Sequence, residues 1–158
     1  MKKTMLLSFI LLLAAVPVFA SCQKSPEPVL LTVFVYDLCG GCSSAVESVG
    51  CGECKDINRY HGIVRVQMGD RLYDGSIEYR ILNCRENDNN DISDQRGRRY
   101  GVPEELLLIR PMTYIGTEDR GLYLPGEDAL HYVKEALDRY QAGEDVGDIQ
   151  GDIMSLIG

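Results

Sequence analysis

The chain has 158 residues, 45% of them hydrophobic and 25% charged, which is enough for one domain with a buried core. Its formal net charge is −8, and it becomes more negative still if Lys2 and Lys3 are removed with an N-terminal signal segment. This balance argues against a nucleic-acid partner and against electrostatic attraction to anionic lipid.

The N-terminal segment has the pattern of an export signal. Lys2 and Lys3 precede an apolar stretch, residues 5–19, that is too short to span a bilayer. The residues that follow, up to Cys22, resemble a bacterial lipobox, in which the chain is cut before the cysteine and the thiol is lipidated. We therefore expect a signal peptide at 1–21, a lipidated Cys22 and a polar tether at 22–28. Ordinary cleavage after Ala20, with Cys22 left unmodified, is the alternative.

The first half of the remaining chain contains one clear strand and a cysteine-rich segment. Residues 29–36 are apolar and β-branched, which is typical of a strand covered on both faces. Residues 39–54 form a Gly-, Ser- and Cys-rich loop, with room for one helical turn at 43–49. Residues 55–73 carry apolar side chains at helical spacing, although two glycines and three β-branched residues leave a short strand at 63–68 as the alternative.

The second half predicts a strand, a hairpin and a closing helix. Residues 77–84 alternate as a strand does, 85–94 read as a polar loop, and 93–100 form a short helix. Residues 111–116 and 121–124 predict a hairpin with its turn at 117–120. An amphipathic helix starts near Asp128 and ends near Gly143. The acidic C-terminal extension, 143–158, forms one loose helix or none, so we place the domain at 29–142.

Over residues 29–140 this order resembles the thioredoxin-like superfamily. Three features carry the resemblance: a CxxC motif after the first strand, Pro111 at the start of a strand, and the segment 123–128 before the last helix. It implies an α/β fold, a thioredoxin-like three-layer sandwich with a central mixed sheet of about four strands. It also implies a cis proline beside the dithiol, with Pro111 favoured and Pro103 second. The chain has no Trp before the motif, and its second CxxC is not a thioredoxin feature.

The cysteines form two CxxC motifs, Cys39/Cys42 and Cys51/Cys54. At a helix amino end, a CxxC motif lowers the pKa of its first thiol, whose thiolate attacks a partner disulfide, and the second thiol resolves the mixed disulfide. The first motif follows the strand directly and the second precedes the longer helix, so the reactive pair stays open. Neither contains His or Pro between its cysteines.

Two alternative hypotheses involve the same four cysteines. C-x2-C-x8-C-x2-C is also a spacing that holds zinc with four thiolates, and two static disulfides would simply staple the loop. In either case the domain is a non-catalytic binding module. We expect Cys84 to be a buried apolar side chain, with a third redox thiol as the alternative. We expect His61 to be a solvent-facing helical residue, with membership of a cysteine metal site as the alternative, and His131 to be structural. The three arginines at 96–99 are expected to form a solvated helix face, with a docking patch for an acidic partner as the alternative.

These observations predict a thiol–disulfide oxidoreductase in the bacterial cell envelope, exported and held at the membrane by a lipid anchor. Its site residues are the four CxxC cysteines and Pro111, and it needs no cofactor unless the zinc alternative holds. The expected partners are cysteine-containing envelope proteins and a membrane reductase that renews the dithiol.

Overall fold

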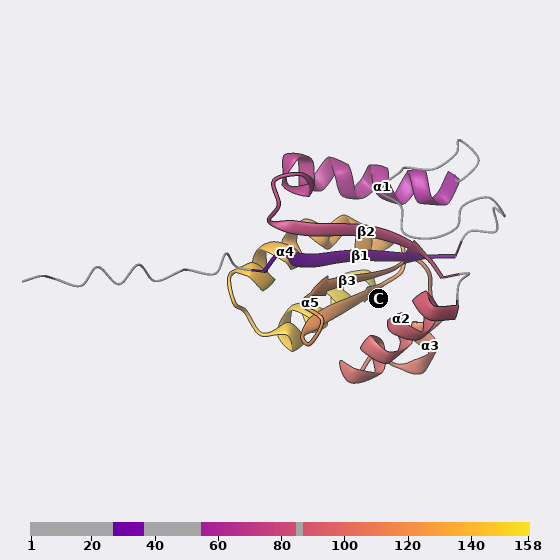
Figure 1. Cartoon of the computed structure of the whole chain (residues 1–158). Coiled ribbons are helices and arrows are strands. Elements are labelled where there is room, and N and C mark those ends of the chain that lie inside the picture. The colour runs from indigo at the N-terminus through magenta and orange to yellow at the C-terminus, as the bar shows by residue number, and fades with distance from the viewer. Residues whose placement is uncertain (1–26, 37–54, 85–86) are drawn as a thin grey trace, which may run out of the picture.

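The computed structural model describes residues 27–36, 55–84 and 87–158. Its centre is a mixed sheet with the strand order β2-β1-β3-β4. The strands are β1 (Val29–Val35), β2 (Ile77–Asn83), β3 (Met112–Gly116) and β4 (Gly121–Pro125). β1 runs parallel to β2 and antiparallel to β3, and β3 and β4 form the predicted hairpin. Helices lie on both sides (Figure 1), so the predicted fold class, a thioredoxin-like α/β sandwich, is confirmed.

The central position of β1 follows from its composition. Leu31, Val33 and Val35 belong to one buried cluster and Phe34 to another, because neighbouring side chains of a strand point to opposite faces of the sheet. A strand that is apolar on both faces must be covered on both, and the parallel β1–β2 pair requires a crossover between them. That crossover contains α1 (Lys55–Met68).

The first face of the sheet is covered by α1 and α4 (Val133–Gln141). Residues at helical spacing in α1 point into this core, namely Ile57, Tyr60, Val64 and Met68. The helix prediction is therefore confirmed, and the alternative of a short strand at 63–68 is wrong. A 3-10 helix (Gly69–Leu72) follows α1, and another (Asp128–Tyr132) precedes α4.

The second face is covered by α2 (Asn87–Arg99) and α3 (Glu104–Leu107). The prediction of a polar loop at 85–94 is wrong from Asn87 onward. The residues of α2 that pack inward include Ser93 and Gly97, four positions apart and buried. Because small residues replace the usual aliphatic stripe, the segment shows little of the apolar periodicity by which a helix is recognised in a sequence.

The C-terminal residues, for which the sequence left open one loose helix or none, form the helix α5 (Val146–Ile157). Asp145 caps it, since its side chain accepts a hydrogen bond from the Gly147 N–H at 2.8 Å. Ile149 and Ile153 are fully buried in the larger core, so the acidic extension contributes to that core. The Gln150 side-chain oxygen accepts the Tyr123 N–H at 2.8 Å, and α5 thereby satisfies part of the outer edge of β4.

The register gives the sheet two distinct ends. Phe34 pairs with Met112 near the carboxyl end of β1, and Leu30 pairs with Gly116 near its amino end. Pro111 therefore lies at the end from which the cysteine-rich segment departs. The hairpin turn at 117–120 lies at the opposite end, where β1 begins.

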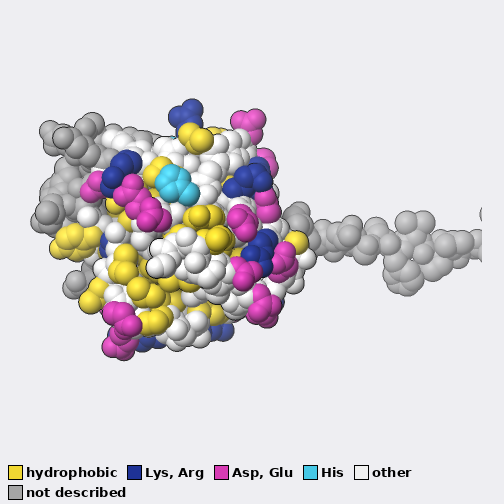
Figure 2. All heavy atoms as spheres, turned by 180° about the vertical axis from the view of Figure 1, so that it is seen from behind, with side chains coloured by type: hydrophobic (Ala, Val, Ile, Leu, Met, Phe, Trp, Pro, Cys, Tyr) yellow, Lys and Arg dark blue, Asp and Glu magenta, His cyan; other side chains and the backbone are white. Residues whose placement is uncertain are grey.

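The molecular surface mixes both signs of charge. On the side turned away from the viewer of Figure 1, acidic and basic side chains alternate around apolar ones (Figure 2). Several of these charges are paired, as in the contacts of Arg71 and Lys134 with Asp138 at 2.5 and 2.6 Å. None of the helices in the described ranges combines the length and the hydropathy needed to cross a membrane.

Candidate functional site at the carboxyl end of β1

The predicted thiols Cys39, Cys42, Cys51 and Cys54 lie outside the described residues, as does the predicted lipidation site Cys22. The structure nevertheless describes what surrounds the two points where the cysteine-rich segment joins the fold. One junction is the end of β1, and the other is the start of α1 at Lys55, the residue that follows Cys54 in the sequence.

Pro111 is buried immediately before β3, and the Arg110–Pro111 peptide bond is cis. This confirms the choice of Pro111 over Pro103, because no other cis bond occurs in the described ranges. The pairing of Phe34 with Met112 places Pro111 beside Val35, the last residue of β1. The Pro111 carbonyl accepts a hydrogen bond from the Gly126 N–H at 2.8 Å, which ties it to the segment after β4.

The amino end of α1 reaches the same region. Arg59, in the second turn of α1, forms an ion pair with Glu127 at 2.9 Å, and Glu127 follows the Gly126 that bonds to Pro111. The end of β1, the start of α1 and Pro111 are thus connected through neighbouring residues. The end of β1 and the start of α1 lie at the same end of the molecule (Figure 1).

The electrostatics of this region come mainly from the start of α1. The first turn of a helix presents unpaired N–H groups and the positive end of its dipole, both of which favour a thiolate. The Arg59 side chain, in the second turn of α1, is shared by Asp56 at 3.2 Å and Glu127 at 2.9 Å. Because two carboxylates offset the charge of Arg59, the positive potential at the start of α1 does not depend on that side chain alone.

Cys84, Arg110 and Asp94 form a second set of polar groups near Val35. The Cys84 N–H donates to the Val35 carbonyl at 2.6 Å, and the Arg110 guanidinium approaches the Asp94 carboxylate at 3.7 Å. Arg110 also donates to the carbonyls of Leu107 and Ile109, which holds the segment before Pro111 against α3. Arg110 is one residue from Pro111, and no sequence pattern marked it or Asp94.

Cys84 is only 5% exposed and packs with Phe34 and Met112. Burial raises the pKa of its thiol, and the nearby Arg110 only partly opposes this. Cys84 is therefore a protonated, buried thiol, as expected for a small apolar side chain.

The two histidines lie apart from this site. The His61 ring stacks on Tyr79 of β2 with a centroid distance of 5.7 Å, and its Nδ1 lies 3.2 Å from the Tyr79 hydroxyl. Burial lowers the pKa of His61, with a further contribution from Arg65. His131 is exposed in the 3-10 helix before α4. Within the described residues, no three His, Cys, Asp or Glu side chains gather closely enough to hold a metal ion.

The arginines of α2 are more organised than a solvated face. Arg98 pairs with Glu104 at 3.5 Å, whereas the Arg96 guanidinium lies over the Tyr114 ring, 4.4 Å from its centroid. Arg96 and Arg99 line a pocket at the end of the sheet away from Pro111. The sequence showed these arginines, but only the packing of α2 reveals what they face.

Searches against protein-family models, curated proteins and solved structures found no match to this chain.

Proposed function

We propose that the protein is a thiol–disulfide oxidoreductase of the bacterial cell envelope, anchored to the membrane through Cys22. One observation carries the proposal: the end of β1, the start of α1 and Pro111 lie at one end of the fold, and the sequence between β1 and α1 contains both CxxC motifs. A dithiol in that position combines a rigid strand end, the positive end of a helix and a buried proline beside it.

The start of α1 favours Cys51 and Cys54 as the reactive pair. The helix begins at Lys55, so this motif directly precedes its first turn, whereas residues 43–54 separate Cys42 from α1. The Cys51 thiolate would attack a sulfur of the partner disulfide and release one partner thiolate. The Cys54 thiolate would then attack Cys51 in the mixed disulfide and release the second. The partner gains two electrons, and the Cys51–Cys54 pair becomes a disulfide.

The oxidised pair has to be reduced again for a second turnover. Cys39 and Cys42 would pass electrons to Cys51 and Cys54, since both motifs belong to one segment of the sequence. The oxidising envelope requires an external electron source, for which we propose a membrane reductase. The substrates would be cysteine-containing envelope proteins, with Pro111 shaping the edge against which they bind.

The test is a thiol titration of the full chain, in detergent, across a series of glutathione redox buffers, with zinc measured on the same sample. We expect two or four thiols to titrate reversibly at a potential between about −270 and −120 mV, without bound metal. One zinc per chain protecting four thiols, or no exchange at any potential, would overturn the enzymatic proposal and leave a binding module.

Paired variants identify the reactive motif. In Cys54→Ser, we expect the mixed disulfide between Cys51 and a model partner to accumulate, because the resolving thiol is absent. Cys42→Ser is the matched variant in the other motif and should still release the partner. Cys84→Ala serves as the control for a buried thiol and should leave the exchange rate unchanged. Accumulation in Cys42→Ser alone would assign the chemistry to Cys39 instead.

A further inference from the structure

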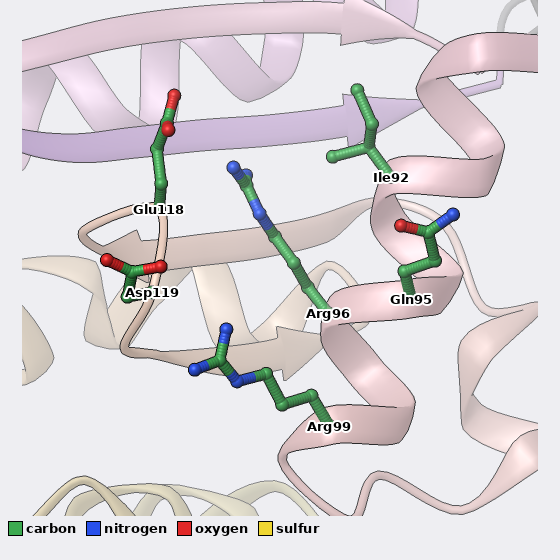
Figure 3. Close-up of a pocket in the computed structure, with 6 residues that line it drawn as sticks. All are labelled: Ile92, Gln95, Arg96, Arg99, Glu118 and Asp119. Atoms are coloured by element: carbon green, nitrogen blue, oxygen red, sulfur yellow. The ribbon is translucent and has the colours of Figure 1, made fainter.

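A pocket of about 570 Å³ lies between α2 and the hairpin turn at 117–120 (Figure 3). Its size falls within the range of small-molecule sites. Side chains of both charges line it, together with one apolar and one amide side chain: Ile92, Gln95, Arg96, Arg99, Glu118 and Asp119. The turn lies at the amino end of β1, so this pocket is separate from the candidate thiol site at the carboxyl end.

The cationic wall is formed by α2. Arg96 and Arg99 are three positions apart on the helix and both extend toward the turn (Figure 3). The stacking of Arg96 on the Tyr114 ring, at 4.4 Å, holds its guanidinium in place without neutralising it. Neither arginine forms an ion pair with any residue that the structure describes, in contrast to Arg98 and its partner Glu104.

The anionic wall is a turn fixed by three tyrosine hydroxyls. Tyr100 donates to the Asp119 carbonyl at 2.7 Å, Tyr140 to the Arg120 carbonyl at 3.1 Å, and Tyr114 to the Thr117 carbonyl. With its backbone held, the turn presents Glu118 and Asp119 to the pocket (Figure 3). Neither carboxylate has an ion-pair partner in the described part of the chain.

Two unpaired cations therefore face two unpaired anions across a ligand-sized space. A simple anion would pair with the arginines but would be repelled by the two carboxylates. A simple cation would pair with the carboxylates but would be repelled by the two arginines. A ligand that carries both charges satisfies both walls. Guanidinium groups suit a phosphate, which they bind through paired N–H groups, and carboxylates suit a primary ammonium with its three N–H donors.

The position of the pocket indicates where such a ligand would come from. β1 begins at this end of the sheet, and residues 22–28 before it reach at most about 25 Å when extended. If Cys22 is the lipid anchor proposed above, the pocket lies within that reach of the membrane. A zwitterionic headgroup has no net charge, so the net charge of −8 on the protein does not repel it as it would an anionic lipid.

We propose that this pocket binds the zwitterionic headgroup of a membrane phospholipid, with its phosphate on Arg96 and Arg99 and its primary ammonium on Glu118 and Asp119. This inference rests on the proposed anchoring for the source of the ligand. The binding chemistry itself depends on neither the anchor nor the thiols. Such contact would hold the amino end of β1 toward the bilayer and turn the candidate thiol site away from it.

The test is a titration of the full chain, in a non-ionic detergent, with soluble glycerophosphoethanolamine, monitored by the methyl NMR signal of Ile92. We expect saturable binding that becomes about tenfold weaker in Arg96→Gln and in Glu118→Gln. Arg98→Gln is the matched control, because Arg98 is on the same helix but pairs with Glu104 outside the pocket. We expect that variant to bind as the unaltered chain does.

Single-charge probes test the requirement for both charges. Inorganic phosphate, glycerol 3-phosphate and ethanolamine should each bind at least tenfold more weakly than glycerophosphoethanolamine. Equal binding of inorganic phosphate would overturn the proposal in favour of a free-anion site, and the absence of any saturable shift would overturn it altogether.

A second arm identifies the membrane as the source. Nanodiscs of phosphatidylethanolamine should shift the Ile92 signal as the soluble probe does, and nanodiscs of phosphatidylcholine, which lacks ammonium N–H groups, should not. The same shift in both would overturn headgroup recognition. Thiol exchange enters neither readout, so failure here leaves the proposed oxidoreductase untouched.

Discussion

The two faces of the sheet are covered by different kinds of contact. On the first face, α1, α4 and α5 bury mainly aliphatic side chains in one continuous cluster. On the second face, α2 and α3 form a smaller cluster in which Tyr114 and Tyr123 are the largest members. On this face α2 approaches α3 closely because Gly97 has no side chain: an added Cβ at Gly97 would lie 2.0 Å from a methyl carbon of Leu107.

The aliphatic first face contributes mainly to stability, and the second face carries the groups that we assign to binding. The aliphatic face resembles an ordinary protein interior, where burial scales with apolar area. The second face carries tyrosine hydroxyls that reach the hairpin turn, the Arg96 side chain stacked on Tyr114, and the ion pair of Arg110 with Asp94. Hydrogen-bonding and charged groups therefore gather on the second face, whereas the first face contains the larger buried apolar cluster.

The largest expected effect is a cavity on the aliphatic face. Ile153 of α5 is fully buried, so Ile153→Ala should lower the free energy of unfolding by about 2–5 kcal/mol. Leu156 of the same helix is 58% exposed, and Leu156→Ala should change it by less than about 0.5 kcal/mol. Urea unfolding of both variants measures the contrast. Equal effects would mean that α5 does not belong to the core.

The next effect tests the close approach on the second face. Gly97→Ala should destabilise the fold by about 1–3 kcal/mol, because Leu107 is buried and has little room to move. Gly62 is the matched glycine in α1, and its added Cβ would meet nothing within 4 Å. Gly62→Ala should therefore stabilise the protein by roughly 0.5–1 kcal/mol, the usual gain in a helix interior. Opposite signs are expected in thermal unfolding, and the same sign would contradict this packing.

The same contrast explains which elements could be predicted from the sequence. Apolar periodicity located β1 and α1, because Ile57, Tyr60 and Val64 bury the stripe that the pattern shows. It failed for α2, whose packing depends on Ser93 and Gly97. The pocket was equally hidden, since Arg96 and Glu118 meet only through the placement of α2 against the turn.

At the candidate thiol site, the sequence anticipated the cis bond at Pro111 through a family resemblance, and the structure confirms that bond. Arg110 and Asp94 were missed because their relation is tertiary: one precedes β3 and the other lies in α2. A single charged residue in a sequence carries no sign of its partner, so such contacts emerge only once the faces of the sheet are assigned.

A smaller effect is expected from a polar group inside the aliphatic face. The Thr113 hydroxyl is fully buried and finds no hydrogen-bond partner within the described ranges. Thr113→Val keeps the shape and removes the unpaired hydroxyl, so it should raise the free energy of unfolding by about 1 kcal/mol. Thr117→Val is the control, because the Thr117 hydroxyl accepts the Arg120 N–H at 3.2 Å and its loss should destabilise the turn. Denaturant titration measures both variants. If Thr113→Val lowered the free energy of unfolding, the Thr113 hydroxyl would have a hydrogen-bond partner after all.

The smallest effect is a pH dependence from His61 of α1, whose ring stacks on Tyr79 of β2. Burial and Arg65 lower its pKa in the folded state below the usual value near 6.5, so the folded protein binds fewer protons at this site than the unfolded chain. The resulting stability is present above about pH 6.5 and is lost as the pH falls through the lowered folded-state pKa. His61→Phe keeps a ring against Tyr79 but cannot titrate. Between pH 7 and pH 5 we therefore expect the unaltered chain to lose more stability than this variant. Parallel curves across that range would show that the imidazole is equally free to take up a proton in both states, and that the first face tolerates a charge at its rim.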